Sequence, residues 1–237
     1  MTTLGLLVCT ATRAEHDACA EGIRAAGARR LESLRVGVGP VHAARRLRER
    51  LANGPAPTRV VSTGFAGALS AGVPLGAWIN AHALFEWRDG TLTSIASVSP
   101  LVVEAAAFEC LPCDVVSTDQ LVGRDSLLRR LESSRPLAAD MESAALAREA
   151  AACSVAFSVM RLVSDTPEHP LPEFLEPFTA AMAGSDARTR VLFTARGVGS
   201  VLVDPVGIAR LVSTGRRLTK QLRADFARLA QLLDAPD

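Results

Sequence analysis

Residues 59–69 have the sequence Arg-Val-Val-Ser-Thr-Gly-Phe-Ala-Gly-Ala-Leu. The short run from Arg59 to Ser62 predicts a buried strand, and the glycines at 64 and 67 predict a tight turn directly after it. In open α/β sheets, ligands bind beyond the carboxyl ends of the strands. This stretch therefore predicts a sheet strand whose following turn offers backbone N–H groups to an anion or a sugar oxygen.

The same pattern extends on both sides of this stretch. Short apolar runs alternate with longer Ala-, Leu- and Arg-rich segments of helical period, which is typical of an α/β domain. No linker in residues 1–237 is long enough to separate domains, so we expect one domain. Strands are expected at 4–10, 34–38, 59–62, 77–85, 93–98, 114–117 and 154–163, and helices at 14–26, 41–51, 140–152 and 206–233.

The composition indicates a small-molecule protein. Of 237 residues, 49% are hydrophobic, which is ample for a buried core. The 26 basic and 25 acidic side chains give a formal charge of +1, which disfavours a protein that coats nucleic acid or an anionic membrane. Aromatic residues make up 4% and Tyr is absent, so few side chains could stack on single-stranded nucleic acid.

The cysteines and the apolar runs of the sequence indicate in which cellular compartment the protein is expected. Five cysteines are an odd number in a chain too large to need disulfides, which suits a reducing compartment. Cys110 and Cys113 form a lone CxxC without a second ligand pair, so no metal is expected. The start of the chain lacks a basic leader, and no 18-residue apolar stretch occurs. We therefore expect a cytoplasmic protein.

The usual nucleotide and hydrolase signatures are missing. There is no G-x-x-x-x-G-K-[ST] loop, and Gly37-Val38-Gly39 lacks the third glycine of a dinucleotide fingerprint. G-x-S-x-G and H-E-x-x-H are also absent. The sequence thus disfavours ATP hydrolysis, hydride transfer and serine esterase chemistry.

Two further segments place carboxylates near predicted element ends. Asp140-Met141-Glu142-Ser143 opens the Ala-rich helix, and Arg161-Leu162-Val163-Ser164-Asp165 closes the last strand. Taken singly, each acid could be an ordinary helix cap or first-turn residue. The two segments follow residues 59–69 in a fixed order, and this order of the three segments together points to a function.

Together the three segments resemble the nucleoside phosphorylase and nucleosidase superfamily. VSTGFAGAL (61–69) is similar to its ribose and anion turn, ADMESAALA (139–147) to its ribose-binding segment, and MRLVSDT (160–166) to the strand that ends in its purine-protonating Asp. The resemblance covers most of residues 4–180. It implies a central mixed, partly barrel-like sheet flanked by helices, a phosphorylase/hydrolase-like fold, and a homo-oligomer without a cofactor.

Within that superfamily, DMES and DTPEHPLP (165–172) most resemble the hopanoid-associated phosphorylases, which are thought to release adenine from an adenosylated polycyclic lipid. The methylthioadenosine and adenosylhomocysteine nucleosidases are close cousins. The resemblance therefore implies a glycosyltransferase of hopanoid biosynthesis that cleaves the N-glycosidic bond of an adenosine derivative by phosphorolysis, with inorganic phosphate as co-substrate.

The resemblance also implies residue roles. Asp165, assisted by Ser164, would protonate the purine, and this requires a raised pKa. Glu142 would hold the ribose hydroxyls. The other substrate-binding candidates are Met141, Val122, Thr63, Gly64 and Phe65. Leu121 stands where adenosine-specific nucleosidases have Phe, so stacking on the base is expected from Phe65 or Phe157 instead.

The nucleophile is the open question. Glu15 resembles the carboxylate that activates water in the nucleosidases, which gives a hydrolytic alternative. A carboxylate disfavours phosphate, because like charges 4 Å apart repel by about 4 kcal/mol at an effective dielectric of about 20. Gly39, Arg45 and Arg161 are the candidates for binding phosphate. All but one of the basic residues are Arg, so arginines discriminate poorly here.

The C-terminal helix leaves two further alternatives. Residues 184–237 carry nine basic and five acidic side chains, a net charge of +4. A basic amphipathic helix at 206–233 could contact a membrane, or could pack its Leu stripe on its own sheet. The chain could also be a nucleoside-binding protein without turnover.

Overall fold

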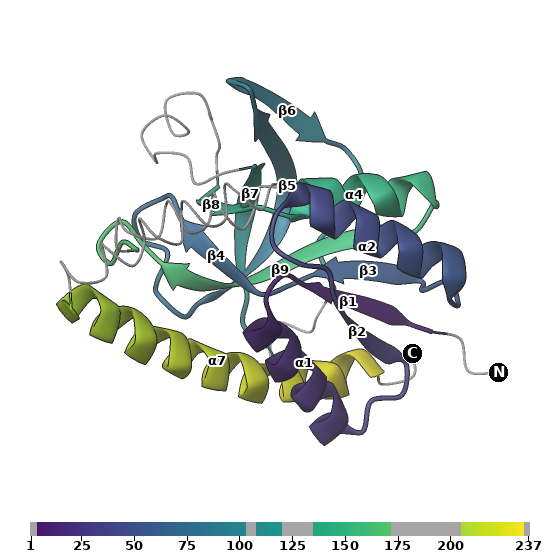
Figure 1. Cartoon of the computed structure of the whole chain (residues 1–237), viewed down its shortest axis with the longest axis horizontal. Helices are drawn as coiled ribbons and strands as arrows, with labels where there is room; N and C mark the ends of the chain where they lie inside the picture. Colours follow the sequence, from purple (N-terminus) through teal and green to yellow (C-terminus); the bar gives the residue numbers. More distant parts are fainter. Residues whose placement is uncertain (1–3, 103–107, 120–134, 172–204, 235–237) are drawn as a thin grey trace, which may run out of the picture.

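The computed structural model describes residues 4–102, 108–119, 135–171 and 205–234 (Figure 1). One nine-stranded mixed sheet runs in the order β2-β1-β3-β9-β4-β8-β7-β5-β6. The strands are β1 (Leu6–Thr10), β2 (Leu31–Arg35), β3 (Arg59–Ser62), β4 (Phe65–Ala68), β5 (Trp78–Arg88), β6 (Thr91–Ile95), β7 (Leu111–Thr118), β8 (Leu137–Asp140) and β9 (Ala156–Asp165). The helices are α1 (Arg13–Ala26), α2 (Pro40–Asn53), α4 (Ser143–Ala152) and α7 (Pro205–Asp234).

The sheet divides into an open half and a closed half around β9. On one side β2, β1, β3 and β9 are all parallel. On the other side β9 pairs with β4 and also with β5, so that β9, β4, β8, β7 and β5 form a closed ring. This closure makes the sheet partly barrel-like, and the predicted mixed α/β sheet flanked by helices is confirmed.

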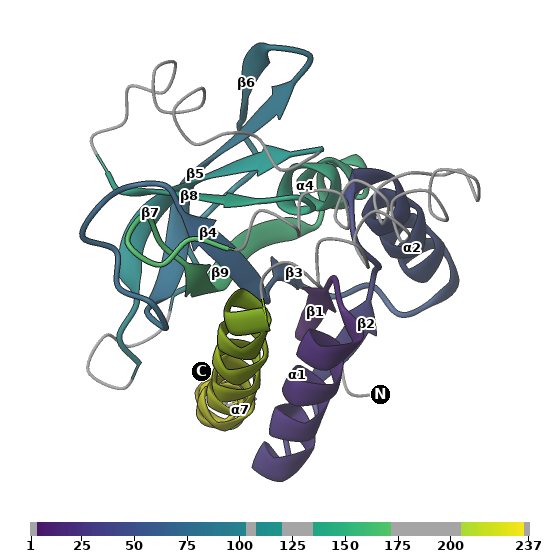
Figure 2. The ribbon, with the colours of Figure 1, turned by 60° about the vertical axis from the view of Figure 1, so that its left-hand side comes forward.

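Alternating strand residues build two cores, one on each face of the open half. Leu7, Cys9, Phe157 and Val159 face α2 and α4, whereas Leu6, Val8, Met160 and Leu162 face α1 and α7. The second core receives the stripe of α7 that the sequence indicated, with Leu218, Leu222, Phe226 and Leu229 buried. Figure 2 shows α1 and α7 side by side below the sheet. The apolar stripe of α7 therefore packs inside the protein. This was one of the two alternatives expected for this helix, the other being contact with a membrane.

Some predicted element boundaries were wrong. The second strand ends at Arg35 rather than Val38, because the chain turns at Gly37 and Gly39, both with positive φ. Phe65–Ala68 is a strand rather than part of a turn. Asp140 ends β8 instead of opening a helix, and α4 begins at Ser143.

No helix among the described residues is long and apolar enough to cross a membrane. The five cysteines are free; Cys113 is buried and Cys110 is half-buried. Within the described ranges, no cluster of His, Cys, Asp or Glu could hold a metal ion.

Candidate active site

The candidate residues gather where the parallel strands β1, β3 and β9 end. The chain leaves β1 into the N-terminus of α1, and it leaves β3 through Thr63 and Gly64 into β4. The middle of β9 carries Arg161 and its end carries Asp165. Close packing of strands and helix termini thus brings residues separated by up to 150 positions to one edge of the sheet.

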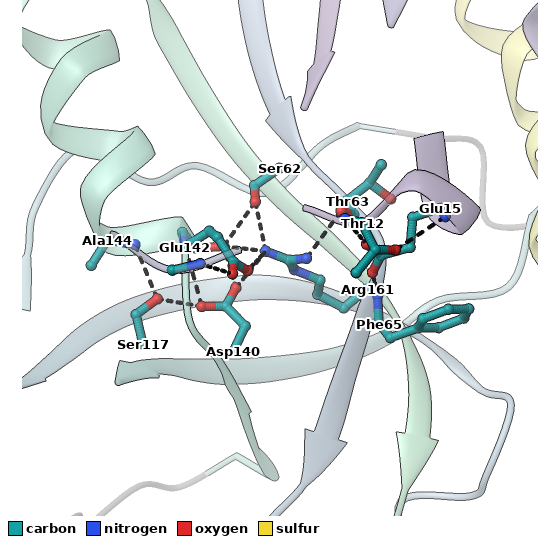
Figure 3. A network of polar contacts seen from close by, with 12 residues as sticks. Thr12, Glu15, Ser62, Thr63, Phe65, Ser117, Asp140, Glu142, Ala144 and Arg161 are labelled. Atoms are coloured by element: carbon teal, nitrogen blue, oxygen red, sulfur yellow. Dashed lines mark hydrogen bonds and ion pairs between the residues drawn. The ribbon is translucent and has the colours of Figure 1, made fainter. Parts of the chain in front are cut away.

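Arg161 is the centre of a buried polar network (Figure 3). Its guanidinium is 1% exposed and lies 2.8 Å from a carboxylate oxygen of Asp140. Nη1 donates to the carbonyl of Thr63 at 3.0 Å, and Nη2 donates to the hydroxyls of Ser62 at 2.8 Å and Ser143 at 3.1 Å. Burial opposes its charge, but Asp140, Glu142 and Glu15 raise the pKa of Arg161 above its usual value. The guanidinium is a fixed positive charge among three carboxylates.

Glu142 lies beside this ion pair with an unusual protonation equilibrium. Its Oε1 accepts a hydrogen bond of 2.8 Å from the backbone N–H of Gly39, and its Oε2 is 3.9 Å from Arg161. Burial raises the pKa of Glu142 to about 7, with Arg161 opposing the rise and Asp140 adding to it. The amide of Gly39, a predicted phosphate ligand, is therefore already bound to a carboxylate of the protein.

Glu15 occupies the N-terminus of α1 and links it to β4. Its Oε2 accepts from the backbone N–H and the hydroxyl of Thr12, both at 2.7 Å, and the Thr12 hydroxyl caps the helix in return. Its Oε1 accepts from the backbone N–H of Phe65 at 2.7 Å. Of the roughly four lone-pair positions of a carboxylate, three are thus filled and one remains on Oε1.

Gly64 allows this approach of Glu15. A Cβ at this position would lie 2.3 Å from Oε1 of Glu15 and 3.2 Å from Nη1 of Arg161. The backbone there has φ +125°, which L side chains rarely adopt. The turn sequence Thr-Gly-Phe is therefore explained by contacts within the site.

Asp165 ends β9 as the expected acid. Its Oδ1 accepts a hydrogen bond of 2.6 Å from the hydroxyl of Ser164. Burial raises the pKa of Asp165, and the Ser164 hydrogen bond partly opposes this rise. Gly67 has no side chain where Oδ2 of Asp165 sits, since a Cβ there would be 2.6 Å away. Asp165 has the raised pKa that a proton donor needs.

The other predicted residues have mixed positions. Thr63 is fully buried, and its hydroxyl has no hydrogen-bond partner among the described residues. Met141 is half-buried, and Arg45 is exposed on α2. Val122 and Leu121 lie outside the described residues.

Sequence reasoning missed Asp140, Ser62, Ser117 and Ser143. Asp140 accepts hydrogen bonds from the hydroxyls of Ser117 and Ser143 and pairs with Arg161. The signal available in the sequence was a Ser or Asp at the end of an apolar run. Finding that these residues meet at one site also requires the order of the strands in the sheet, which the sequence did not reveal.

A cavity of about 670 Å³ lies next to the site. Phe65 and Ser164 form the wall toward the candidate catalytic groups, and α7 forms the opposite wall with Leu211 and Leu218. This cavity is large enough for a ligand of drug size.

Comparison with solved structures identifies the fold. The 5′-methylthioadenosine/S-adenosylhomocysteine nucleosidase of Helicobacter pylori, bound to butyl-thio-DADMe-Immucillin-A, matches with a TM-score of 0.57 and 16% identity, over 84% of this chain and 100% of that one. A mutant of the same nucleosidase with 5′-methylthioadenosine in the active site matches with a TM-score of 0.54 and 15% identity, again over 84% and 100%.

The futalosine hydrolase of Helicobacter pylori matches with a TM-score of 0.55 and 16% identity, over 83% of this chain and 98% of that one. The chain has a nucleosidase fold. No family model matches the sequence, and no curated protein matches it. The nucleosidase fold agrees with the superfamily that the three sequence segments resemble, and at 15–16% identity these comparisons show the fold alone.

Proposed function

We propose that this protein cleaves the N-glycosidic bond of a purine nucleoside. One observation carries the proposal: within a nucleosidase fold, strand β9 brings together an acid with a raised pKa and a contact to a second carboxylate. Asp165, whose pKa is raised, ends β9, and Arg161 of the same strand lies 3.9 Å from Glu142. Arg161 and Asp165 are four residues apart, or about 13 Å along a strand. This spacing suits a ribose held near Glu142 and a purine near Asp165.

The chemistry requires a proton donor and a polar ribose site. A purine leaves easily only when its ring is protonated, and its departure leaves positive charge on the ribose. Asp165 would donate the proton, with Ser164 orienting its carboxyl group. Glu142 would accept hydrogen bonds from the ribose hydroxyls, and Met141 would pack against the sugar.

We propose water as the nucleophile. Glu15, Asp140 and Glu142 surround Arg161, the one buried Arg or Lys among the described residues, so a phosphate dianion would meet an excess of negative charge. The sequence favoured phosphorolysis, but two of its phosphate candidates, Gly39 and Arg161, already bind Glu142 and Asp140. The remaining lone pair of Glu15 could hold a water molecule, as the hydrolytic alternative expects.

The substrate is proposed to be an adenosine derivative with a large 5′ substituent. One of the neighbours with the same fold, the Helicobacter pylori nucleosidase, is named for 5′-methylthioadenosine and S-adenosylhomocysteine. The 670 Å³ cavity beside Phe65 and Ser164 would take a bulky group, including the polycyclic lipid that the sequence resemblance implies. The predicted cytoplasmic location, homo-oligomer and peripheral membrane contact stay predictions.

The test is release of free adenine from adenosine derivatives, with and without phosphate. We expect release in both buffers, with free ribose derivative rather than a ribose 1-phosphate as the second product. Asp165→Asn should lower kcat by about 10²–10⁴-fold, because it removes the proton donor, while Asp17→Asn on the exposed face of α1 should not change it.

Three other outcomes are distinguishable. A strict requirement for phosphate would restore phosphorolysis as the reaction. Tight adenosine binding without release would favour the non-catalytic alternative. Equal turnover by wild type and Asp165→Asn would refute the assignment of the acid.

A further inference from the structure

Thr12 binds Glu15 through one hydrogen bond more than a helix cap requires. As in an ordinary capping box, the Thr12 hydroxyl accepts from the backbone N–H of Glu15 at 3.3 Å, and Oε2 of Glu15 accepts from the backbone N–H of Thr12 at 2.7 Å. A third bond runs from the Thr12 hydroxyl to the same Oε2, also at 2.7 Å. The capping box alone does not account for this third bond.

The third bond closes Oε2 of Glu15 to other donors. A hydroxyl has one proton to donate and two lone pairs that accept. The N–H of Glu15 occupies a lone pair of the Thr12 hydroxyl, and the hydroxyl proton points at Oε2. Oε2 then has two donors, both from Thr12, and they fill its two lone pairs. It has no position left for a water molecule or a substrate hydroxyl.

Oε1 of the same carboxylate is only half occupied. It accepts from the backbone N–H of Phe65 at 2.7 Å, and the described residues supply no second donor to it. Figure 3 shows Thr12, Glu15 and Phe65 together on one side of Arg161. The two oxygens of a free carboxylate are equivalent, so the difference between Oε1 and Oε2 is made by the protein. Because Thr12 supplies both donors of Oε2, this residue decides which oxygen stays open.

We propose that Thr12 is a positioning residue for the nucleophile. By filling Oε2, its hydroxyl confines the water that attacks the ribose to the open lone pair of Oε1, and it stops the carboxylate of Glu15 from turning. This inference rests on the proposed function, because it takes Glu15 to be the group that activates water. Thr12 acts on the substrate only through Glu15.

Loss of this positioning should cost rate and not substrate binding. A general base must lie within hydrogen-bond reach of the proton that it takes, and a displacement of about 1 Å can cost about 100-fold in rate. The purine and the ribose are assigned to Asp165 and Glu142, whose hydrogen bonds go to Ser164 and Gly39. Removing the Thr12 hydroxyl should therefore lower kcat and leave KM unchanged.

Two substitutions of Thr12 test this role in adenine release. Thr12→Val keeps the shape of the side chain but removes the hydroxyl, and should lower kcat by about 10- to 100-fold without changing KM or the Kd of adenine. Thr12→Ser keeps the hydroxyl and should retain most of the wild-type kcat. Thr219→Val is the matched control, because Thr219 on α7 is also half-buried and its hydroxyl donates to the carbonyl of Gly215 at 2.8 Å; it should leave kcat unchanged.

A residue that only caps α1 would give a different result. Thr12→Val would then unfold at a lower urea concentration, but its folded form would keep the wild-type kcat, and this outcome would overturn the proposal. Kinetics are therefore compared on protein that circular dichroism shows to be fully folded. A loss of kcat that Thr12→Ser does not recover, or a rise in KM that accounts for the whole effect, would also overturn it.

Crystal structures at high resolution separate this proposal from the proposed function. If no nucleoside releases adenine, the proposed function fails, but ordered water around Glu15 can still be located in the wild type and in Thr12→Val. Water on Oε1 and none on Oε2 in the wild type, with water on Oε2 or a turned carboxylate in the variant, would support the positioning role on its own. Water on Oε2 of the wild type, or an identical carboxylate and water in the variant, would overturn it.

Discussion

The carboxyl group of Glu142 is removed from water, and this burial raises its pKa from 4.5 to about 7. Between these two values the folded protein keeps a proton that the unfolded chain releases, so the free energy of unfolding falls as the pH rises through this window. The full shift corresponds to about 3 kcal/mol. Protonation of Glu142 thus stabilises the fold below pH 4.5 and is lost above pH 7.

Glu142→Gln should remove this pH dependence, because Gln keeps the oxygen that accepts from Gly39 but does not titrate. Relative to the variant, wild type should lose up to about 3 kcal/mol of unfolding free energy from pH 4.5 to pH 8, measured by urea denaturation. Glu49→Gln, at an exposed ion pair, should leave the wild-type slope unchanged. Parallel curves for wild type and Glu142→Gln would contradict the raised pKa.

Gly64 is required by both its backbone and its contact with Glu15. Gly64→Ala should destabilise the protein by about 2–4 kcal/mol, since it adds a Cβ 2.3 Å from Glu15 to the strain of a positive φ. Gly72→Ala is the matched control: it also has a positive φ, but a Cβ there would meet nothing within 4 Å, so it should cost only about 1–2 kcal/mol. Thermal or urea unfolding measures both, and equal costs would show that the contact with Glu15 is unimportant.

The packing of α1 on α7 depends on a second glycine. A Cβ on Gly22 would lie 2.9 Å from the backbone nitrogen of Ala227 and 3.0 Å from the carbonyl of Arg223. Because backbone atoms cannot rotate away, Gly22→Ala should push the helices apart and cost about 1–3 kcal/mol. Gly215→Ala, on α7 with nothing within 4 Å, should instead stabilise by about 0.5–1 kcal/mol through helix propensity. Urea midpoints compare the two, and stabilisation by both changes would refute close packing at Gly22.

Elements with a strong periodic pattern could be predicted from the sequence, and those fixed by distant strands could not. β3 was predicted at its observed bounds, and α7 corresponds to the predicted helix at 206–233. β4 was missed because Phe65-Ala-Gly-Ala has little strand propensity and exists through pairing with β8 and β9. Asp140 was assigned to a helix for its Ala-rich neighbours, although pairing with Ser117 places it in β8.

In the candidate site, too, some features could be predicted from the local sequence and others could not. The carboxylates at 15, 142 and 165 were predicted as site residues because each stands next to a recognisable run of sequence. The ion pair of Arg161 with Asp140 could not, because it joins residues of β9 and β8, which are not neighbours in the sheet. Only the three-dimensional arrangement showed that Arg161 and Gly39 already bind carboxylates of the protein, which changes the proposed nucleophile from phosphate to water.

At the scale of the whole molecule, Arg161 joins the open and closed halves of the sheet. From β9 it reaches Ser62 and Thr63 at the end of β3, Asp140 at the end of β8, and Ser143 at the start of α4. Removing one member of a buried pair leaves an uncompensated charge, so Arg161→Gln and Asp140→Asn should each cost about 3–5 kcal/mol. The double variant leaves neither charge, and should cost less than the sum of the two by about 2 kcal/mol or more.

The exposed pair Arg13–Asp17 on α1, at 3.4 Å, is the control cycle, with an expected coupling of about 0.5 kcal/mol or less. Urea unfolding at pH 8 measures both cycles; additive costs at Arg161 and Asp140 would mean that this ion pair does not contribute to joining the two halves.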